Sequence, residues 1–177
     1  VCHLFSLGCQ PAEAGNAEPA GATGTLSPPV QRARILDVDG TPATMGFRNI
    51  LSRDEAYPEG RYIVLEHQTP EYLWQPRYQT HPNGALALET AMVCAEDVPD
   101  ELGRLETLLG RPPKRGADGV LRFSPQGGGA IELHVAHDFE ARYGWRPGAL
   151  PCFAGVEVWF ASRTHATTLM GDSGVPV

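Results

Sequence analysis

The stretch from Tyr62 to Gly84 constrains the fold of this chain more than any other part of the sequence. It opens with a strand-like run at 61–68 (RYIVLEHQ) and continues through an aromatic-rich connector to a His-Pro-Asn-Gly sequence at 81–84. A second strand-like run follows at 86–95. Because Pro, Asn and Gly interrupt regular elements and favour turns, we expect two strand-containing units joined by a short linker.

The units on either side of this linker are expected to contain similar elements in a similar order. Before the linker, residues 10–29 read as a loop or weak helix, and a turn is predicted at 40–42. After the linker, leucines at helical spacing between Pro99 and Gly110 predict a helix at 99–109. The alternation of apolar and polar residues predicts the strands, at 1–9, 30–39, 45–52, 61–68, 86–95, 120–124, 130–136 and 155–162.

This recurrence, with a period of roughly 60–80 residues, suggests internal duplication. We therefore divide the chain into a first module at 1–80, whose helix is poorly defined, and a second module at 81–150. Residues 151–177 would begin a third strand–helix unit that is incomplete within this sequence.

Composition argues against several classes of function. The chain has 177 residues, of which 42% are hydrophobic and 20% charged, as is typical of a soluble globular protein with a sizeable core. A net charge of −7 without basic runs argues against a nucleic-acid partner. No apolar run approaches the ~18 residues of a membrane span. We expect a cytoplasmic protein, for which a homodimer is left open.

The cysteines contain no Cys-x-x-Cys motif. They are expected to be reduced thiols in the cytoplasm, although their even number leaves disulfides open. They are Cys2, Cys9, Cys94 and Cys152.

Three motifs around the linker point to a known family. Gly46-Phe47-Arg48-Asn49 forms a Gly-x-x-Asn motif in a central strand, Glu66 ends the first module, and residues 81–84 form the His-Pro-Asn-Gly joint. In these features the chain resembles glyoxalase-like proteins of the vicinal oxygen chelate (glyoxalase/bleomycin resistance/dioxygenase) superfamily. The resemblance covers residues 30–177 and, more weakly, 1–10. It implies an α+β fold in which paired βαβββ modules form curved sheets around a cavity.

Side-chain alternation indicates which residues would face such a cavity. Residues two apart on a strand share a face. Glu66 therefore lies opposite the Ile/Leu face of its strand, and Glu132 and His134 together lie opposite Ile131 and Leu133. We expect Glu66 and Glu132 to point into one shared cavity.

The resemblance also implies a divalent metal ion held by the first and last strands of the modules. His3 matches the histidine that opens the first strand in metal-binding relatives, and Glu66, Glu132 and His134 are the other candidate ligands. Imidazole and carboxylate suit Zn, Fe, Mn or Ni. The matching position of the second module falls at Glu89-Thr90, without a histidine, which leaves open a set short of one ligand. His3 has the alternative interpretation of a surface residue.

Four further residues are candidates for contact with a small-molecule substrate. Arg48, Asn49 and Arg77 lie near the expected rim and could hold an anionic or carbonyl-bearing compound, and Trp74 could line the cavity. The structural alternatives are solvated arginines, a turn asparagine and an aromatic residue that pins the linker.

Two functions of different class remain. The first is a glyoxalase-like lyase, isomerase or dioxygenase, in which a metal chelates substrate oxygens and Glu66 or Glu132 acts as ligand or general base. The second is a metal-free protein of the bleomycin-resistance type that binds or sequesters a small molecule.

Overall fold

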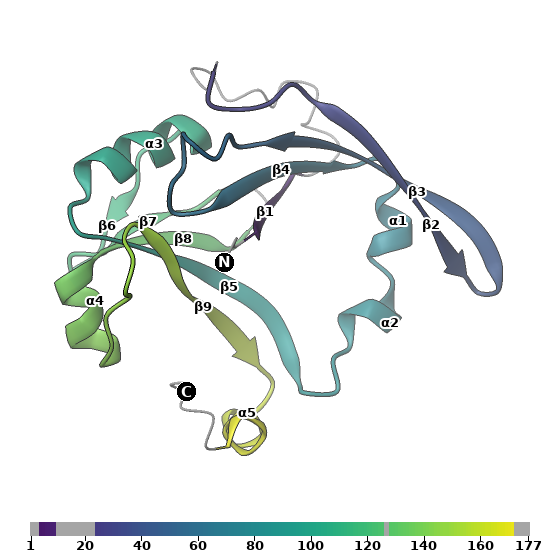
Figure 1. Ribbon diagram of the computed structural model, residues 1–177. Helices are drawn as coiled ribbons and strands as arrows, with labels where there is room; N and C mark the ends of the chain where they lie inside the picture. Colours follow the sequence, from purple (N-terminus) through teal and green to yellow (C-terminus); the bar gives the residue numbers. More distant parts are fainter. Residues whose placement is uncertain (1–3, 10–23, 126–127, 172–177) are drawn as a thin grey trace.

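The computed structural model describes residues 4–9, 24–125 and 128–171, and these form an α+β fold with two sheets (Figure 1). The first sheet has the strand order β1-β4-β3-β2. In it β1 runs parallel to β4, and the other neighbours are antiparallel. Its strands are β1 (Leu4–Cys9), β2 (Val30–Val38), β3 (Thr41–Leu51) and β4 (Arg61–His67).

The second sheet has the strand order β6-β7-β8-β5-β9. In it β5 runs parallel to β8, the relation that β1 has to β4, and β9 adds an antiparallel edge strand beside β5. Its strands are β5 (Ala85–Ala95), β6 (Lys114–Arg115), β7 (Leu121–Phe123), β8 (Ala130–Val135) and β9 (Cys152–Phe160).

Helices connect and flank the sheets. The longest described helix, α3 (Pro99–Leu109), follows β5. It begins at a proline and ends at Gly110, whose left-handed backbone (φ +65°) suits glycine. Two single-turn helices in the linker connect the sheets at the end remote from α3 (Figure 1). No helix of the described residues is long and apolar enough to cross a membrane. The remaining helices are α1 (Pro70–Leu73), α2 (Pro76–Gln79), α4 (Ala136–Tyr143) and α5 (Arg163–Met170).

Most of the predicted elements are present. The α+β class is confirmed, and the helix at 99–109 has the predicted bounds. The turn predicted at 40–42 is wrong in part, because β3 already begins at Thr41, opposite Val38. The strand predicted from residue 155 begins earlier, at Cys152. The weak helix predicted at 10–29 lies mostly outside the described residues, and its described part, 24–29, contains a turn and an isolated bridge at Leu26.

One hydrophobic core joins the two sheets. Tyr62, at the start of β4, is completely buried, and its ring lies 5.3 Å edge-on from the ring of Phe153 on β9. On the second sheet the same core includes Leu105 and Leu108 of α3 together with Ile131 and Leu133 of β8. The fully buried aromatic Tyr62 therefore lies where the two halves of the chain pack together.

A buried carboxylate lies within this junction. The side chain of Glu59, just before β4, has an exposed fraction of 0%. Its Oε1 accepts a 3.1 Å hydrogen bond from the hydroxyl of Tyr62, and its Oε2 lies 3.5 Å from Nη2 of Arg104 on α3. Arg104 is also paired with Glu101, at 2.8 Å. Burial raises the pKa of Glu59 above its ordinary value, which the charge of Arg104 offsets only in part.

The raised pKa gives Glu59 a predictable effect on stability. Between the ordinary value and the folded-state value, the folded protein holds a proton that the unfolded chain releases, so stability falls as pH rises through this window. Replacing Glu59 by Gln keeps an acceptor for Tyr62 and removes the titration. We expect the stability of Glu59→Gln relative to wild type to increase from pH 5 to pH 8 in urea unfolding. Glu55→Gln, at an exposed position, is the control substitution. A constant difference between Glu59→Gln and wild type across this range would contradict the assignment.

Candidate functional site

The candidate site lies on one face of β8 and β5. Ile131 and Leu133 of β8 point into the shared core, so Glu132 and His134 occupy the opposite face, as alternation predicts. In the parallel pairing, Met92 lies beside Glu132 and Cys94 beside His134. This face is also covered, because Glu132 and His134 are each only 2% exposed. Both side chains are therefore enclosed by the protein and not open to solvent.

The carboxylate of Glu132 has two partners. Its Oε1 is paired with Nη2 of Arg122, the residue directly opposite on β7. Its Oε2 lies 2.9 Å from Nε2 of His134. Because an ionised carboxylate can only accept hydrogen bonds, Nε2 of His134 must carry the proton in this pair. Both oxygens of the buried carboxylate are thus satisfied within the protein.

These contacts keep Glu132 charged despite its burial. The hydrogen bond from His134 and then the contact with Arg122 lower the pKa of Glu132, and they outweigh the desolvation that acts in the opposite direction. The bond to Glu132 in turn raises the pKa of Arg122. Glu132 is therefore a buried anion. Its negative charge is compensated by the positive charge of Arg122, whose side chain is 52% exposed at the surface.

Helix α4 covers the buried end of this face. It follows β8 without a connecting loop and ends at Gly144, whose φ of +76° suits a residue without a side chain. The ring of Phe139 lies 5.5 Å from that of His134, and the ring of Tyr143 lies 6.1 Å from it. Phe139 belongs to a small second core with Met92 and Cys94. The helix therefore places aromatic rings over the Glu132–His134 pair.

Two hydroxyl groups beside this pair are buried without a hydrogen-bond partner among the described residues. They are Oγ1 of Thr90 and the phenol oxygen of Tyr143. Thr90 is completely buried and precedes Met92 by two residues, so it lies on the face of the sheet that carries Glu132. Burial raises the pKa of Tyr143, and the negative charges of Glu132 and Glu157 act in the same direction.

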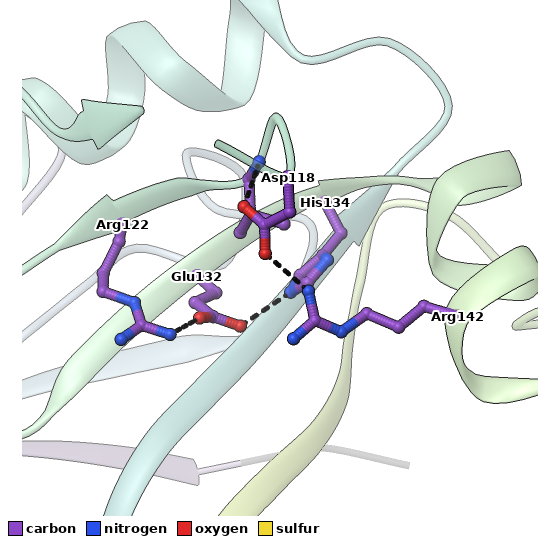
Figure 2. A network of polar contacts seen from close by, with 6 residues as sticks. Asp118, Arg122, Glu132, His134 and Arg142 are labelled. Carbon is purple, nitrogen blue, oxygen red and sulfur yellow. Dashed lines mark hydrogen bonds and ion pairs between the residues drawn. The ribbon is translucent and has the colours of Figure 1, made fainter. Parts of the chain in front are cut away.

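A second ion pair lies next to the first. Nη1 of Arg142 on α4 is 2.6 Å from Oδ2 of Asp118, in the turn before β7. Figure 2 shows this pair beside the row formed by Arg122, Glu132 and His134. A small pocket borders the cluster and is lined in part by Asp118, Val120 and His134. Two half-exposed arginines, Arg122 and Arg142, therefore form the outer layer of a site whose inner layer is buried.

The predicted residues of the first sheet form a separate group. Arg48 and Glu66 face each other across β3 and β4, with Nε of Arg48 2.7 Å from Oε2 of Glu66. Asn49 points to the other face of β3, and its Oδ1 is buried without a partner among the described residues. Glu66 is paired with Arg48, whereas Glu132 is paired with Arg122 and His134, so these ion pairs share no residue. That these two carboxylates share one cavity stays a prediction.

The predicted linker residues lie on the surface. Trp74 is 62% exposed, and its ring lies 6.3 Å from that of His67. Arg77 donates a hydrogen bond to the carbonyl of Asp37 and is paired with Asp39 at 3.3 Å, which ties the linker to the hairpin between β2 and β3. These contacts fit a structural role for Arg77.

The metal-ligand set is not assembled by the described residues. Within residues 4–9, 24–125 and 128–171, no three His, Cys, Asp or Glu side chains are grouped so as to hold a metal ion. His3 lies outside the described residues, and both oxygens of Glu132 are already engaged. The described donors, as arranged, therefore do not fit a metal ion.

Sequence reasoning missed three residues of this cluster. Arg122 lies in a predicted strand, but the sequence does not show that the strand register places it opposite Glu132, where it forms an ion pair. Tyr143 lies on a helix that was not predicted, although Gly144 after an amphipathic run could have indicated the end of one. Thr90 stands in the sequence only as a position where the expected histidine is missing, and its burial comes from the packing of the sheet.

Comparison with known proteins adds information on the fold. No family model matches this sequence, and no curated protein matches it significantly. Among solved structures, the chain is similar to a hypothetical protein from Staphylococcus aureus, with a TM-score of 0.61 and 10% sequence identity. The similarity covers 90% of this chain and 58% of that structure. The chain thus spans little more than half the length of that protein, and the likeness is one of fold alone.

Proposed function

We propose that this protein binds a small organic molecule without a metal ion, at the cluster formed by Thr90, Arg122, Glu132, His134 and Tyr143. The observation that carries the proposal is the pair of buried hydroxyls without partners, Thr90 Oγ1 and the phenol of Tyr143. Thr90 shares a sheet face with Glu132, and the ring of Tyr143 lies 6.1 Å from that of His134, the hydrogen-bond partner of this buried anion.

Unpartnered buried hydroxyls are unfavourable in the free protein. Leaving a buried polar group unsatisfied costs about 1–3 kcal/mol, and most such groups in folded proteins have a partner. A ligand that bears a carbonyl, hydroxyl or carboxylate group would supply one, because a hydroxyl can both donate and accept. Binding would then recover an interaction that the free protein lacks.

The surrounding groups indicate the chemistry of the ligand. Arg122 and Arg142 are each about half exposed and carry more N–H donors than their carboxylate partners occupy, which favours an anionic group on the ligand. Phe139 contacts the rings of Tyr143 and Trp145 in tilted and edge-on arrangements, and Trp145 is 43% exposed, which provides an aromatic contact for a ligand. A small aromatic carboxylate combines both properties.

The architecture included in this proposal is a pair of βαβββ modules. Its support is that the strand order of the first sheet recurs in the second, where β5, β8, β7 and β6 match β1, β4, β3 and β2. The parallel partner also recurs, as β1 with β4 and β5 with β8. In this interpretation β9 and α5 begin a further unit, and curved sheets of the modules surround the ligand space.

Tryptophan fluorescence tests both the binding and its location. The chain has three tryptophans, at 74, 145 and 159. The ring of Trp145 lies 5.4 Å from that of Phe139, which contacts His134. Titration with benzoate, salicylate or phenylacetate should change the emission of wild type and of the variants Trp74→Phe and Trp159→Phe. The change should disappear in Trp145→Phe.

Benzyl alcohol is the uncharged control and should bind at least tenfold more weakly than benzoate. A response that survives in Trp145→Phe but disappears in Trp74→Phe would move the site to the linker. Absence of any response, together with unchanged thermal stability in millimolar carboxylate, would refute the proposal.

Thr90→Val separates binding from stability. Valine has nearly the shape of threonine and removes the unpartnered hydroxyl, so the free energy of unfolding should rise by about 1 kcal/mol. Affinity for the carboxylate should fall at the same time. Thr107→Val is the matched control, because the Thr107 hydroxyl donates to the carbonyl of Gly103 on α3, away from the cluster. Urea unfolding and fluorescence titration measure the two effects. A loss of stability in Thr90→Val would show that its hydroxyl already has a partner.

The metal-dependent glyoxalase-like enzyme is the second candidate. The observation that favours it is the presence of Glu132 and His134, two potential donors, buried side by side on one strand face. Elemental analysis of protein purified without chelators tests it. Stoichiometric Zn, Fe, Mn or Ni that is lost in Glu132→Gln would support this candidate over metal-free binding.

A further inference from the structure

Two cysteines lie directly opposite each other on neighbouring strands of the second sheet. Cys94 of β5 and Cys152 of β9 are register partners in the antiparallel pairing, and both are free thiols. They also belong to the same small core, with Met92, Phe139 and Leu150. The two side chains are therefore on one face of the sheet and adjacent.

This placement meets the distance requirement of a disulfide. Residues directly opposite in an antiparallel pair have Cα atoms about 4.5–5.5 Å apart, and disulfides span Cα separations of about 4.4–6.8 Å. The Cβ atoms of such a pair are about 4.5–5.5 Å apart, so a small approach of the strands would close the bond. The pairing of β5 with β9 already changes register between Met92 and Val93, next to the cysteines, so the local ladder is not a continuous regular one.

We propose that Cys94 and Cys152 form a redox-active pair that hydrogen peroxide converts into a cross-strand disulfide. The inference is independent of the ligand-binding function proposed above, since it depends only on the strand register and the shared core.

Exposure decides the order of the steps. Cys94 is completely buried, whereas Cys152 is partly exposed at the start of β9, so peroxide reaches Cys152 first.

The Cys152 thiolate attacks one peroxide oxygen. The O–O bond breaks, a sulfenic acid forms, and the departing hydroxide takes a proton to give water. The sulfur of Cys94 then attacks the sulfenic sulfur and loses its proton. The S–S bond forms, the S–O bond breaks, and a second water leaves. Two electrons pass from the sulfur pair to the peroxide.

The reaction should be slow at neutral pH and faster in alkali. Burial raises the pKa of both thiols, that of Cys94 to about 11, so little thiolate is present at pH 7. Because the thiolate fraction grows nearly tenfold with each pH unit below the pKa, the rate of disulfide formation should rise by well over tenfold between pH 7 and pH 9. A pair with these properties would respond to sustained oxidation and not to brief exposure.

The test uses the full chain with Cys2 and Cys9 both replaced by Ser, so that only this pair remains. After treatment with hydrogen peroxide, the intact mass should fall by two hydrogen atoms, and both thiols should become unreactive in denaturant until a reductant is added. Trypsin should release peptide 78–104, which carries Cys94, linked to peptide 143–163, which carries Cys152. The melting temperature should rise by roughly 5–15 °C, because the bond restricts the unfolded chain.

Cys152→Ser in the same background is the control and should show none of these changes. It replaces the partly exposed member, so that folding should be preserved. The proposal is overturned if Cys152 is oxidised to sulfinic acid while Cys94 stays reduced, or if disulfides form only between two molecules. A failure to bind carboxylates by the reduced protein would count against the proposed function and leave this result unaffected.

Discussion

Glu132→Ala is expected to lower the free energy of unfolding by about 3 kcal/mol. Breaking a buried ion pair by removing one member typically costs about 3–5 kcal/mol. The partner Arg122 is 52% exposed and can be solvated, which places the value at the low end of this range. His134 is buried, with a side-chain exposure of 1%, and would keep an N–H group without an acceptor. Urea unfolding at pH 7 measures the loss.

Glu140→Ala is the matched control for this prediction. Glu140 lies on α4 and is paired with Arg146 at 3.6 Å, with half of its side chain exposed. Exposed ion pairs contribute about 0–1 kcal/mol, so the control should differ little from wild type. Equal effects of the two substitutions would show that Glu132 has no special role in the fold.

The pH dependence gives a second measure of Glu132. Its pKa is lowered in the folded protein, so its contribution is present above the ordinary value of 4.5 and is lost as pH falls through the folded-state value. Glu132→Gln cannot titrate and should flatten the acid limb of stability below about pH 4.5. This sign is opposite to that expected for Glu59, although both residues are buried carboxylates. The difference arises because the histidine and arginine contacts of Glu132 outweigh its desolvation, whereas burial dominates at Glu59.

The sequence predicted those elements whose signals are local. Helix α3 has regular leucine spacing, a proline at its start and a glycine at its end, and its predicted bounds agree with the structure. Strand β8 alternates clearly enough that Glu132 and His134 could be assigned to one face. By contrast, α4 begins directly after β8, at Ala136, without a side-chain cap or a turn residue to mark its start. Its position depends on packing against Met92 and Cys94, which lie more than forty residues away in the sequence.

The candidate site was predictable only in part, because it too depends on contacts between residues that are far apart in the sequence. Glu132 was identified as a site residue, but its partner Arg122 depends on the register of β7 against β8. Register in a sheet follows from the whole buried face and is weakly encoded in one short strand. The Cys94–Cys152 pairing likewise follows from the register of β9 on β5, with its three irregularities, and spacing in the sequence gives no indication of it.

Tyr62→Ala is expected to have the largest effect, a loss of about 4 kcal/mol in the free energy of unfolding. Truncation of a buried aromatic side chain typically costs about 3–5 kcal/mol, because packing is lost and a cavity remains. Tyr62 is completely buried between Tyr57 at 5.2 Å and Phe153 at 5.3 Å, and it contributes a hydrogen bond to the buried Glu59. The melting temperature should fall by roughly 8–16 °C. Tyr78→Ala, at a position 48% exposed in the linker, should change it little.

Tyr62→Phe isolates the hydroxyl from the ring. It preserves the packing on Phe153 and leaves Oε1 of Glu59 without its donor, so the expected loss is smaller, about 1–2 kcal/mol. Because the core around Tyr62 joins both sheets, Trp74 in the linker and Trp159 on β9 should report one common unfolding transition in wild type and in both variants. The Trp74→Phe variant removes the linker signal and the Trp159→Phe variant removes the β9 signal, so unfolding of the two variants separates the two reporters. Two separate transitions, or a loss below 1 kcal/mol in Tyr62→Ala, would show that the halves of the chain are stabilised independently and that Tyr62 does not couple them.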